Sequence, residues 1–165
     1  LNDAKLFDST NVMLVSTHGL YKVDGEEQFY IEECLADYSK IQKIINRHAM
    51  MMIFVNPDEV DEVFFELKVC DQWAPMGDYD DNEQPLVTVY RTAELPDRFH
   101  WKNFRYMPEI VLLTRPGATV LTRELPSIPI IDSYERDIRE TGGWDNENIN
   151  MHGIFLARGP GKFEI

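Results

Sequence analysis

The apolar residues of this chain fall into short runs separated by polar and turn-forming residues, a pattern that predicts a mixture of strands and helices. Residues 12–16, with four apolar residues in five positions, predict a buried strand. The continuous apolar run at residues 49–55 has the length of a strand that is buried on both faces. Further strands are expected at residues 86–92, 109–115 and 152–159. The predicted fold class is therefore α/β, with a layered sheet.

A hairpin and two helices complete this picture. The strand at residues 109–115 runs into a Pro-Gly pair and then into residues 118–124, which predicts a β-hairpin. Residues 29–48 and 56–67 place apolar side chains at helical spacing. The second of these begins with Asn56, expected to cap the helix, and Pro57, expected at its first position.

Length and composition set the next limits. A chain of 165 residues forms one domain or part of a larger one. It has no apolar run long enough to cross a membrane and no signal-like start, and its first residue, Leu1, suggests a trimmed chain. Cys34 and Cys70 have no metal-ligand spacing, so the sequence leaves their disulfide state open.

The charge excludes one class of partner. A net charge of −13, from 29 acidic and 16 basic residues, argues against nucleic-acid binding, which relies on Lys and Arg. Part of the acidity lies in residues 76–85, which we expect to form a solvated loop. That segment does not have a glycine and a distal glutamate at the positions an EF-hand requires, so it does not predict a calcium site.

Three segments resemble a known family in the same order along the chain. Residues 142–163, GGWDNENINMHGIFLARGPGKF, are similar to the closing signature of the ectonucleotide pyrophosphatase/phosphodiesterase family, within the alkaline phosphatase superfamily. Residues 94–117, ELPDRFHWKNFRYMPEIVLLTRPG, and residues 11–20, NVMLVSTHGL, resemble two earlier segments of that family. In the family, the strand that residues 11–20 resemble ends in Ser-Asp-His-Gly-Met.

The resemblance implies a fold and a chemistry. It implies that residues 1–165 are the C-terminal part of an alkaline-phosphatase-like α/β/α sandwich with a mixed, largely parallel sheet. Family members hydrolyse phosphodiester or pyrophosphate bonds of nucleotides, or of choline-bearing lipids, with two zinc ions and a threonine nucleophile. Paired metals stabilise the attacking and leaving oxygens, and each zinc needs about three protein ligands. Members are secreted or membrane-anchored.

The expected ligand set is incomplete in this chain. By the resemblance, the nucleophile and most ligands precede residues 11–20, and the remaining ligands are an Asp-His pair and a later histidine. Thr17 stands where the aspartate is expected and Gly142 where the later histidine is expected, which leaves His18 as the one candidate metal ligand. No catalytic residue is predicted, and zinc is expected only where an intact family-like site is assembled.

Other side chains do not replace the missing ligands or the metals. His48, His100 and His152 are interpreted as structural. Phosphate recognition without metals would fall to a few scattered arginines, which are Arg91, Arg105, Arg115 and Arg123.

Three functions follow from these observations. The first is a degenerate or partial phosphodiesterase-like protein that does not catalyse by itself, which leaves open whether the chain is an enzyme. The second is the C-terminal portion of an active zinc-dependent phosphodiesterase, completed by an N-terminal half. The third is an acidic module that binds another protein. In each case the resemblance implies an extracellular or membrane-anchored location.

Overall fold

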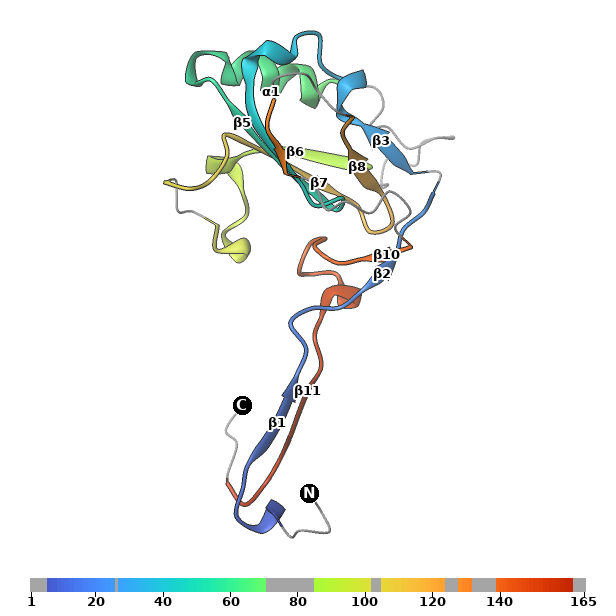
Figure 1. The fold of residues 1–165 in the computed structure, drawn as a ribbon, viewed down its shortest axis with the longest axis vertical. Coiled ribbons are helices and arrows are strands. Elements are labelled where there is room, and N and C mark those ends of the chain that lie inside the picture. Colours follow the sequence, from blue (N-terminus) through green and yellow to red (C-terminus); the bar gives the residue numbers. More distant parts are fainter. Residues whose placement is uncertain are drawn as a thin grey trace.

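The computed structural model describes residues 6–25, 27–70, 85–101, 105–123, 128–131 and 139–161. Figure 1 shows a body that contains a sheet and a helix, and a long two-stranded ribbon that extends away from that body. Apart from Pro85, the acidic segment at residues 76–85 lies outside the described residues, so its loop stays a prediction.

The body is built on a five-stranded mixed sheet in the order β6-β7-β5-β4-β9. Its strands are β4 (Ile41–Asn46), β5 (Met50–Val55), β6 (Val87–Arg91), β7 (Ile110–Thr114) and β9 (Ile130–Ile131). Among the described strands of this sheet, only the β4–β9 pair is parallel. The mixed sheet is confirmed, but the expectation of a largely parallel one is wrong here, since the short β4–β5 connection forces antiparallel pairing.

The predicted helix at residues 29–48 is wrong. This segment forms β3 (Gln28–Tyr30), two short 3-10 turns at Ile31–Glu33 and Tyr38–Lys40, and then β4. A register shift between Ile41 and Lys43 lets two buried isoleucines three positions apart, Ile41 and Ile44, face the same side of a strand. The apolar residues at helical spacing, from Ile31 to Ile45, are in fact divided among the two 3-10 turns, the segment between them and β4.

The second predicted helix is confirmed. A 3-10 turn at Pro57–Glu59 leads into α1 (Val60–Lys68), whose Val63, Phe64 and Leu67 are buried against the sheet. The Asn56 side chain makes no capping hydrogen bond and instead accepts one from Gln42 at 2.7 Å. Helix and sheet together confirm the α/β class. A single α-helix is found among the described residues, so the three-layered sandwich remains an expectation from the family.

The other strands form three separate pairs. β3 pairs in parallel with β8 (Thr119–Leu121), whereas β2 (Tyr21–Lys22) and β10 (Glu140–Thr141), and β1 (Val12–Val15) and β11 (Phe155–Arg158), pair antiparallel. The predicted hairpin is therefore only half right. The chain does turn at Gly117, whose φ is +101°, but β8 then leaves β7 to join β3.

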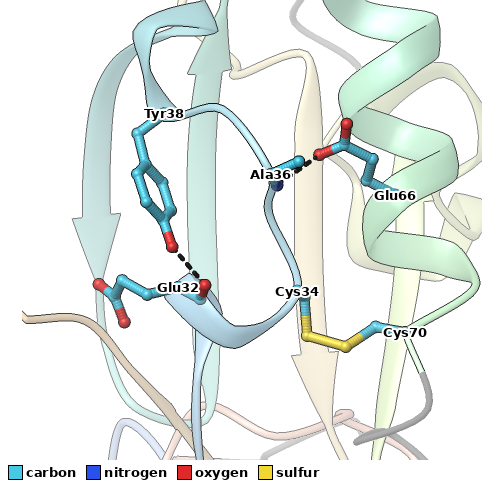
Figure 2. The surroundings of a disulfide bond; sticks show 6 residues. All are labelled: Glu32, Cys34, Ala36, Tyr38, Glu66 and Cys70. Atoms are coloured by element: carbon cyan, nitrogen blue, oxygen red, sulfur yellow. Dashed lines mark hydrogen bonds between the residues drawn. A yellow bond between two sulfur atoms is a disulfide. The ribbon is translucent and has the colours of Figure 1, made fainter.

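A disulfide joins the two cysteines whose state the sequence left open. Cys34 follows the 3-10 turn at Ile31–Glu33, and Cys70 lies beyond the end of α1. Their bond joins these two elements beside the core (Figure 2). Beside it, the Ala36 N–H donates to Glu66 of α1 at 3.1 Å. The described part of the chain contains no helix long and apolar enough to span a membrane.

Candidate metal site

The candidate site forms where the beginning and the end of the chain meet. Antiparallel pairing of β1 with β11 and of β2 with β10 places residues 16–19 against residues 150–154. The Ser16 N–H donates to the Ile154 carbonyl at 3.0 Å, and the Ile154 N–H donates to the Ser16 hydroxyl at 2.8 Å. The Gly19 N–H donates to the Met151 carbonyl at 3.0 Å. Two backbone hydrogen bonds and one to the Ser16 side chain thus hold residues 16–19 in place.

His18 and Gly142 lie side by side at this junction. A Cβ atom built on Gly142 would stand 2.8 Å from His18 Nδ1 and 3.0 Å from the Gly19 carbonyl oxygen. His18 is exposed, and its Nδ1 lies 2.7 Å from that same carbonyl oxygen. The structure therefore brings together two of the three positions that the resemblance assigns to metal ligands. Only one of the two carries a donor atom.

The residues present do not fit a zinc ion. Zinc needs three or four converging donors, and this corner offers one imidazole, a glycine without a side chain and, at Thr17, a neutral hydroxyl. Among the described residues, no group of three or more His, Cys, Asp or Glu side chains is placed to hold a metal. Whether His18 binds a metal in a larger assembly stays a prediction.

The other histidines lie in separate parts of the fold. His48 is buried in the turn between β4 and β5, where its backbone N–H donates to Asn46 Oδ1 at 2.8 Å. His48 therefore lies in a turn between two strands and not within the helix predicted at residues 29–48. His100 ends a 3-10 turn in a left-handed conformation, and His152 is exposed.

Ion pairs with carboxylates limit the use of Arg91, Arg115 and Arg123 for phosphate. Arg91 contacts Asp61 at 2.7 Å, and Arg123 contacts Glu33 at 3.1 Å. Arg115 forms an ion pair with Glu27.

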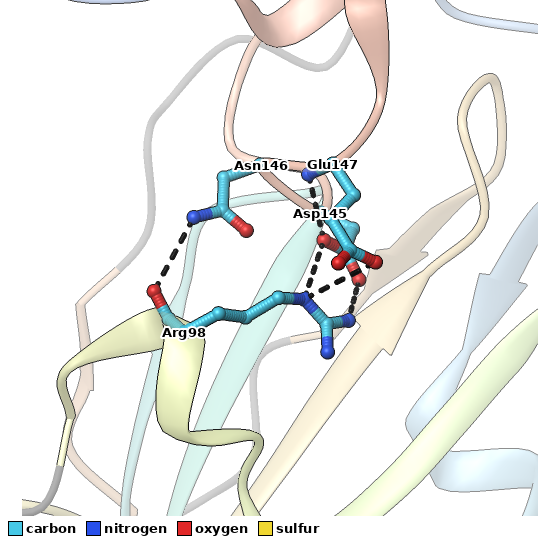
Figure 3. Close-up of polar contacts among 4 residues, drawn as sticks. All are labelled: Arg98, Asp145, Asn146 and Glu147. Atoms are coloured by element: carbon cyan, nitrogen blue, oxygen red, sulfur yellow. Dashed lines mark hydrogen bonds and ion pairs between the residues drawn. The ribbon is translucent and has the colours of Figure 1, made fainter.

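An ion pair that sequence reasoning missed ties the family-like segments together. Arg98, in the 3-10 turn Asp97–Phe99, donates through Nε and a terminal nitrogen to both carboxylate oxygens of Asp145 (Figure 3). The Asn146 amide donates to the Arg98 carbonyl at 3.4 Å, and Arg98 Nε also lies 3.5 Å from Glu147. These contacts join residues 94–117 to residues 142–163. The sequence contained one indication of this pair, namely that Arg98 and Asp145 both lie in segments that resemble the family.

This ion pair sets the protonation of Asp145. Burial raises the pKa of the Asp145 carboxyl, but hydrogen bonds from Arg98 and from the Glu147 backbone outweigh burial and hold the pKa below its ordinary value. Hydrogen bonding to Asp145 likewise raises the pKa of Arg98. The pair is therefore ionised at neutral pH.

We expect replacing Asp145 with asparagine to lower the free energy of unfolding by less than about 1 kcal/mol at pH 7, because the 37% exposed carboxylate is screened by water. A depressed folded pKa gives stability that is present above the unfolded pKa of about 3.9 and is lost as pH falls through the folded value. The difference between wild type and variant should shrink below about pH 4. Urea unfolding at pH 7 and pH 3 measures it, and a difference that grows in acid would contradict this assignment.

An apolar cavity lies beside the Arg98–Asp145 pair rather than beside His18. It has a volume of about 270 Å³ and is lined by side chains that include Phe99, Trp101 and Trp144. Trp144 forms part of its wall. The indole is buried, and its Nε1 donates to Thr114 Oγ1 at 2.8 Å and to the Ala118 carbonyl at 3.2 Å. The carboxylate in its lining, Asp145, is held in the ion pair with Arg98, and the aromatic walls supply packing surface but no nucleophile, so this cavity suggests no reaction.

Comparison with known proteins gives a consistent result. The family model described as type I phosphodiesterase / nucleotide pyrophosphatase matches residues 1–154. The chain is 26% identical to human ectonucleotide pyrophosphatase/phosphodiesterase family member 5 over 162 residues, which are 97% of the chain and 28% of that relative. It is also 26% identical to mouse bis(5'-adenosyl)-triphosphatase enpp4 over 157 residues, 94% of the chain and 28% of the relative.

A solved structure has the same fold. Murine ectonucleotide pyrophosphatase/phosphodiesterase 5 superimposes with a TM-score of 0.72 at 25% identity, over 97% of this chain and 36% of that one. The chain thus spans between about a quarter and a little over a third of the relatives it matches.

Proposed function

This chain belongs to the type I phosphodiesterase / nucleotide pyrophosphatase family, and we propose that it is a partial or degenerate member that does not hydrolyse phosphodiesters by itself. Its sequence lacks the threonine nucleophile and most of the zinc ligands that the family resemblance implies. What it retains is the scaffold of the C-terminal part of a phosphodiesterase-like domain.

One observation carries this proposal. Gly142 stands in contact range of His18, at the place where a second zinc-binding imidazole is expected, and a glycine there supplies no electron pair. Thr17 removes the neighbouring carboxylate, which would have supplied both a ligand and the negative charge that a divalent cation favours. The backbone still brings the strand ends together, so the losses concern donor atoms rather than the fold.

We expect the 165-residue chain to show no zinc-dependent hydrolysis of a chromogenic phosphodiester above the rate with zinc and no protein. The physical reason is that no paired cations and no activated hydroxyl are available to stabilise charge on the reacting phosphorus. The measurement is initial rate against protein concentration with zinc added, and with His18→Ala as the matched variant. A rate that rises with protein, disappears with a chelator and falls in His18→Ala would overturn the proposal.

An active enzyme completed by another polypeptide is the alternative. The fact that relatives extend far beyond the matched part favours it, since they have room for a nucleophile and further ligands. Relatives named as bis(5'-adenosyl)-triphosphatases would then point to nucleotide substrates. Thr17 and Gly142 count against it, because both substitutions persist in any assembly. We therefore place the non-catalytic role first.

Partner and location follow from the same reasoning. We infer that the chain works with a complementary N-terminal half or another protein partner, and not with nucleic acid, given its charge of −13. We infer an extracellular or membrane-anchored location. The relatives' names as ectonucleotide enzymes support it, and so does the Cys34–Cys70 disulfide, since such bonds persist mainly in oxidising compartments.

A further inference from the structure

The two faces of the five-stranded sheet are covered to different extents at β5 and β7. Side chains alternate between the faces along a strand. Met51 and Leu112 belong to the main core, to which α1 contributes. Their neighbours Met50 and Leu113 pair across the two strands and therefore lie on the opposite face, where both are only half-buried. At this point the second face is covered less completely than the face beneath α1.

The apolar cavity beside the Arg98–Asp145 pair lies on this second face. Its lining includes Met50 and Leu113 from the sheet and the rings of Phe99, Trp101 and Trp144. Trp144 is buried, but Phe99 and Trp101 are only half-buried. The cavity thus presents accessible aromatic surface, which a bound molecule would cover.

The polar side chains in the lining already have hydrogen-bond partners. The Trp144 N–H donates within the core. The Asp145 carboxylate accepts from Arg98, and the Asn146 amide donates to the Arg98 carbonyl. A ligand in the cavity would therefore be held by packing against the rings rather than by new hydrogen bonds to these side chains.

The charges around the cavity disfavour an ionic ligand of either sign. The Asp145 carboxylate repels an anion, and Glu147, which lies 3.5 Å from Arg98 Nε, adds a second negative charge nearby. A cation would compete with Arg98, which pairs with Asp145 and lies over the Phe99 ring, 4.7 Å from its centroid. An ionic ligand would lose its hydration without gaining a free partner. The site therefore suits a neutral molecule.

The volume and the walls define the size and polarity of that molecule. The cavity measures about 270 Å³. An apolar cavity of about 150 Å³ holds benzene, so this one has room for two fused rings. A purine would fit by size, but its hydrogen-bonding groups would be left without partners, which costs free energy. The expected ligand is a fused aromatic ring system with few polar atoms.

We propose that this cavity is a binding site for a small, neutral, bicyclic aromatic molecule such as an indole, with Phe99, Trp101 and Trp144 supplying the contact surface. Aromatic rings gain free energy from stacked and edge-to-face contacts beyond the area that they bury, which favours an aromatic occupant over an aliphatic one. The inference goes beyond the proposed function and does not rest on it, because none of these residues belongs to the candidate metal site.

Calorimetric titration of the 165-residue chain with indole-3-ethanol, a neutral probe, tests the proposal. We expect saturable binding of one molecule per chain, with a dissociation constant below about 1 mM. Tryptamine and indole-3-acetate place a positive and a negative charge on the same ring system, and adenine adds hydrogen-bonding groups. Each of these three should bind at least about tenfold more weakly.

Two substitutions change the cavity in opposite ways and should both weaken binding of indole-3-ethanol at least about fivefold. Trp101→Ala removes a half-buried wall, and Leu113→Phe fills the cavity from the sheet. Trp101→Phe keeps a ring and should retain most of the affinity. Tyr106→Ala removes a 71% exposed ring outside the lining and should leave the affinity unchanged. Thermal unfolding verifies that each variant is folded.

Three results would overturn the proposal. The first is the absence of saturable binding to the folded wild-type chain. The second is an affinity that is the same in wild type, folded Trp101→Ala and folded Leu113→Phe. The third is tighter binding of tryptamine, indole-3-acetate or adenine than of indole-3-ethanol, which would assign the cavity to a charged or strongly polar ligand.

Discussion

Replacing Trp144 with alanine is expected to lower the free energy of unfolding by about 3–5 kcal/mol, because the indole is almost fully buried. It fills a small second core with Ala49 and Met151. Its edge also meets the ring of Tyr21, with centroids 6.1 Å apart. Losing this side chain removes the main contact that holds residues 142–151 to the sheet, so the Arg98–Asp145 pair should weaken as well. Urea unfolding measures the change.

Trp144→Phe is the matched control for this substitution. It keeps most of the apolar contact but removes the N–H that donates to Thr114 and to the Ala118 carbonyl. We expect a smaller loss of about 1–3 kcal/mol, from the two buried acceptors left without this donor. A Trp144→Ala variant within about 1 kcal/mol of wild type would show that residues 142–151 do not dock as described.

Removing the disulfide is expected to have the second large effect. Cys34 and Cys70 are 36 positions apart, and closing a loop of that size stabilises the folded state by about 3–4 kcal/mol through the entropy of the unfolded chain. A Cys34→Ala/Cys70→Ala variant should therefore melt roughly 10 °C below the oxidised wild type. A reductant should lower the melting temperature of the wild type and leave the variant unchanged. Equal melting of oxidised wild type and variant would contradict the bond's role.

The sequence pattern was sufficient to predict strands whose apolar residues form one short run. The run at residues 49–55 is confirmed as β5, and the run at residues 109–115 as β7. The helix predicted at residues 29–48 was wrong because two 3-10 turns and a strand in succession place apolar residues at intervals that resemble those of a helix. The hairpin failed because the turn at Gly117 fixes only a change of direction, whereas the partner of β8 is chosen by tertiary packing.

The candidate site was likewise predictable from the sequence only in part. The contact between His18 and Gly142 followed from the family resemblance, since no local pattern links positions so far apart. The pairing of Cys34 with Cys70 stayed open because two cysteines in a sequence carry no geometry. Arg98 was missed because an arginine in a loop gives no sign of which carboxylate it will meet.

Zinc titration by calorimetry tests the central claim most directly. We expect the wild-type chain to bind zinc weakly. Thr17→Asp/Gly142→His restores two donors beside His18, so this variant should bind at least about tenfold more tightly. Gly142→Ala, which adds a Cβ without a donor, should bind no better than wild type. Tight binding of two zinc ions by the wild-type chain, lost in His18→Ala, would contradict the account.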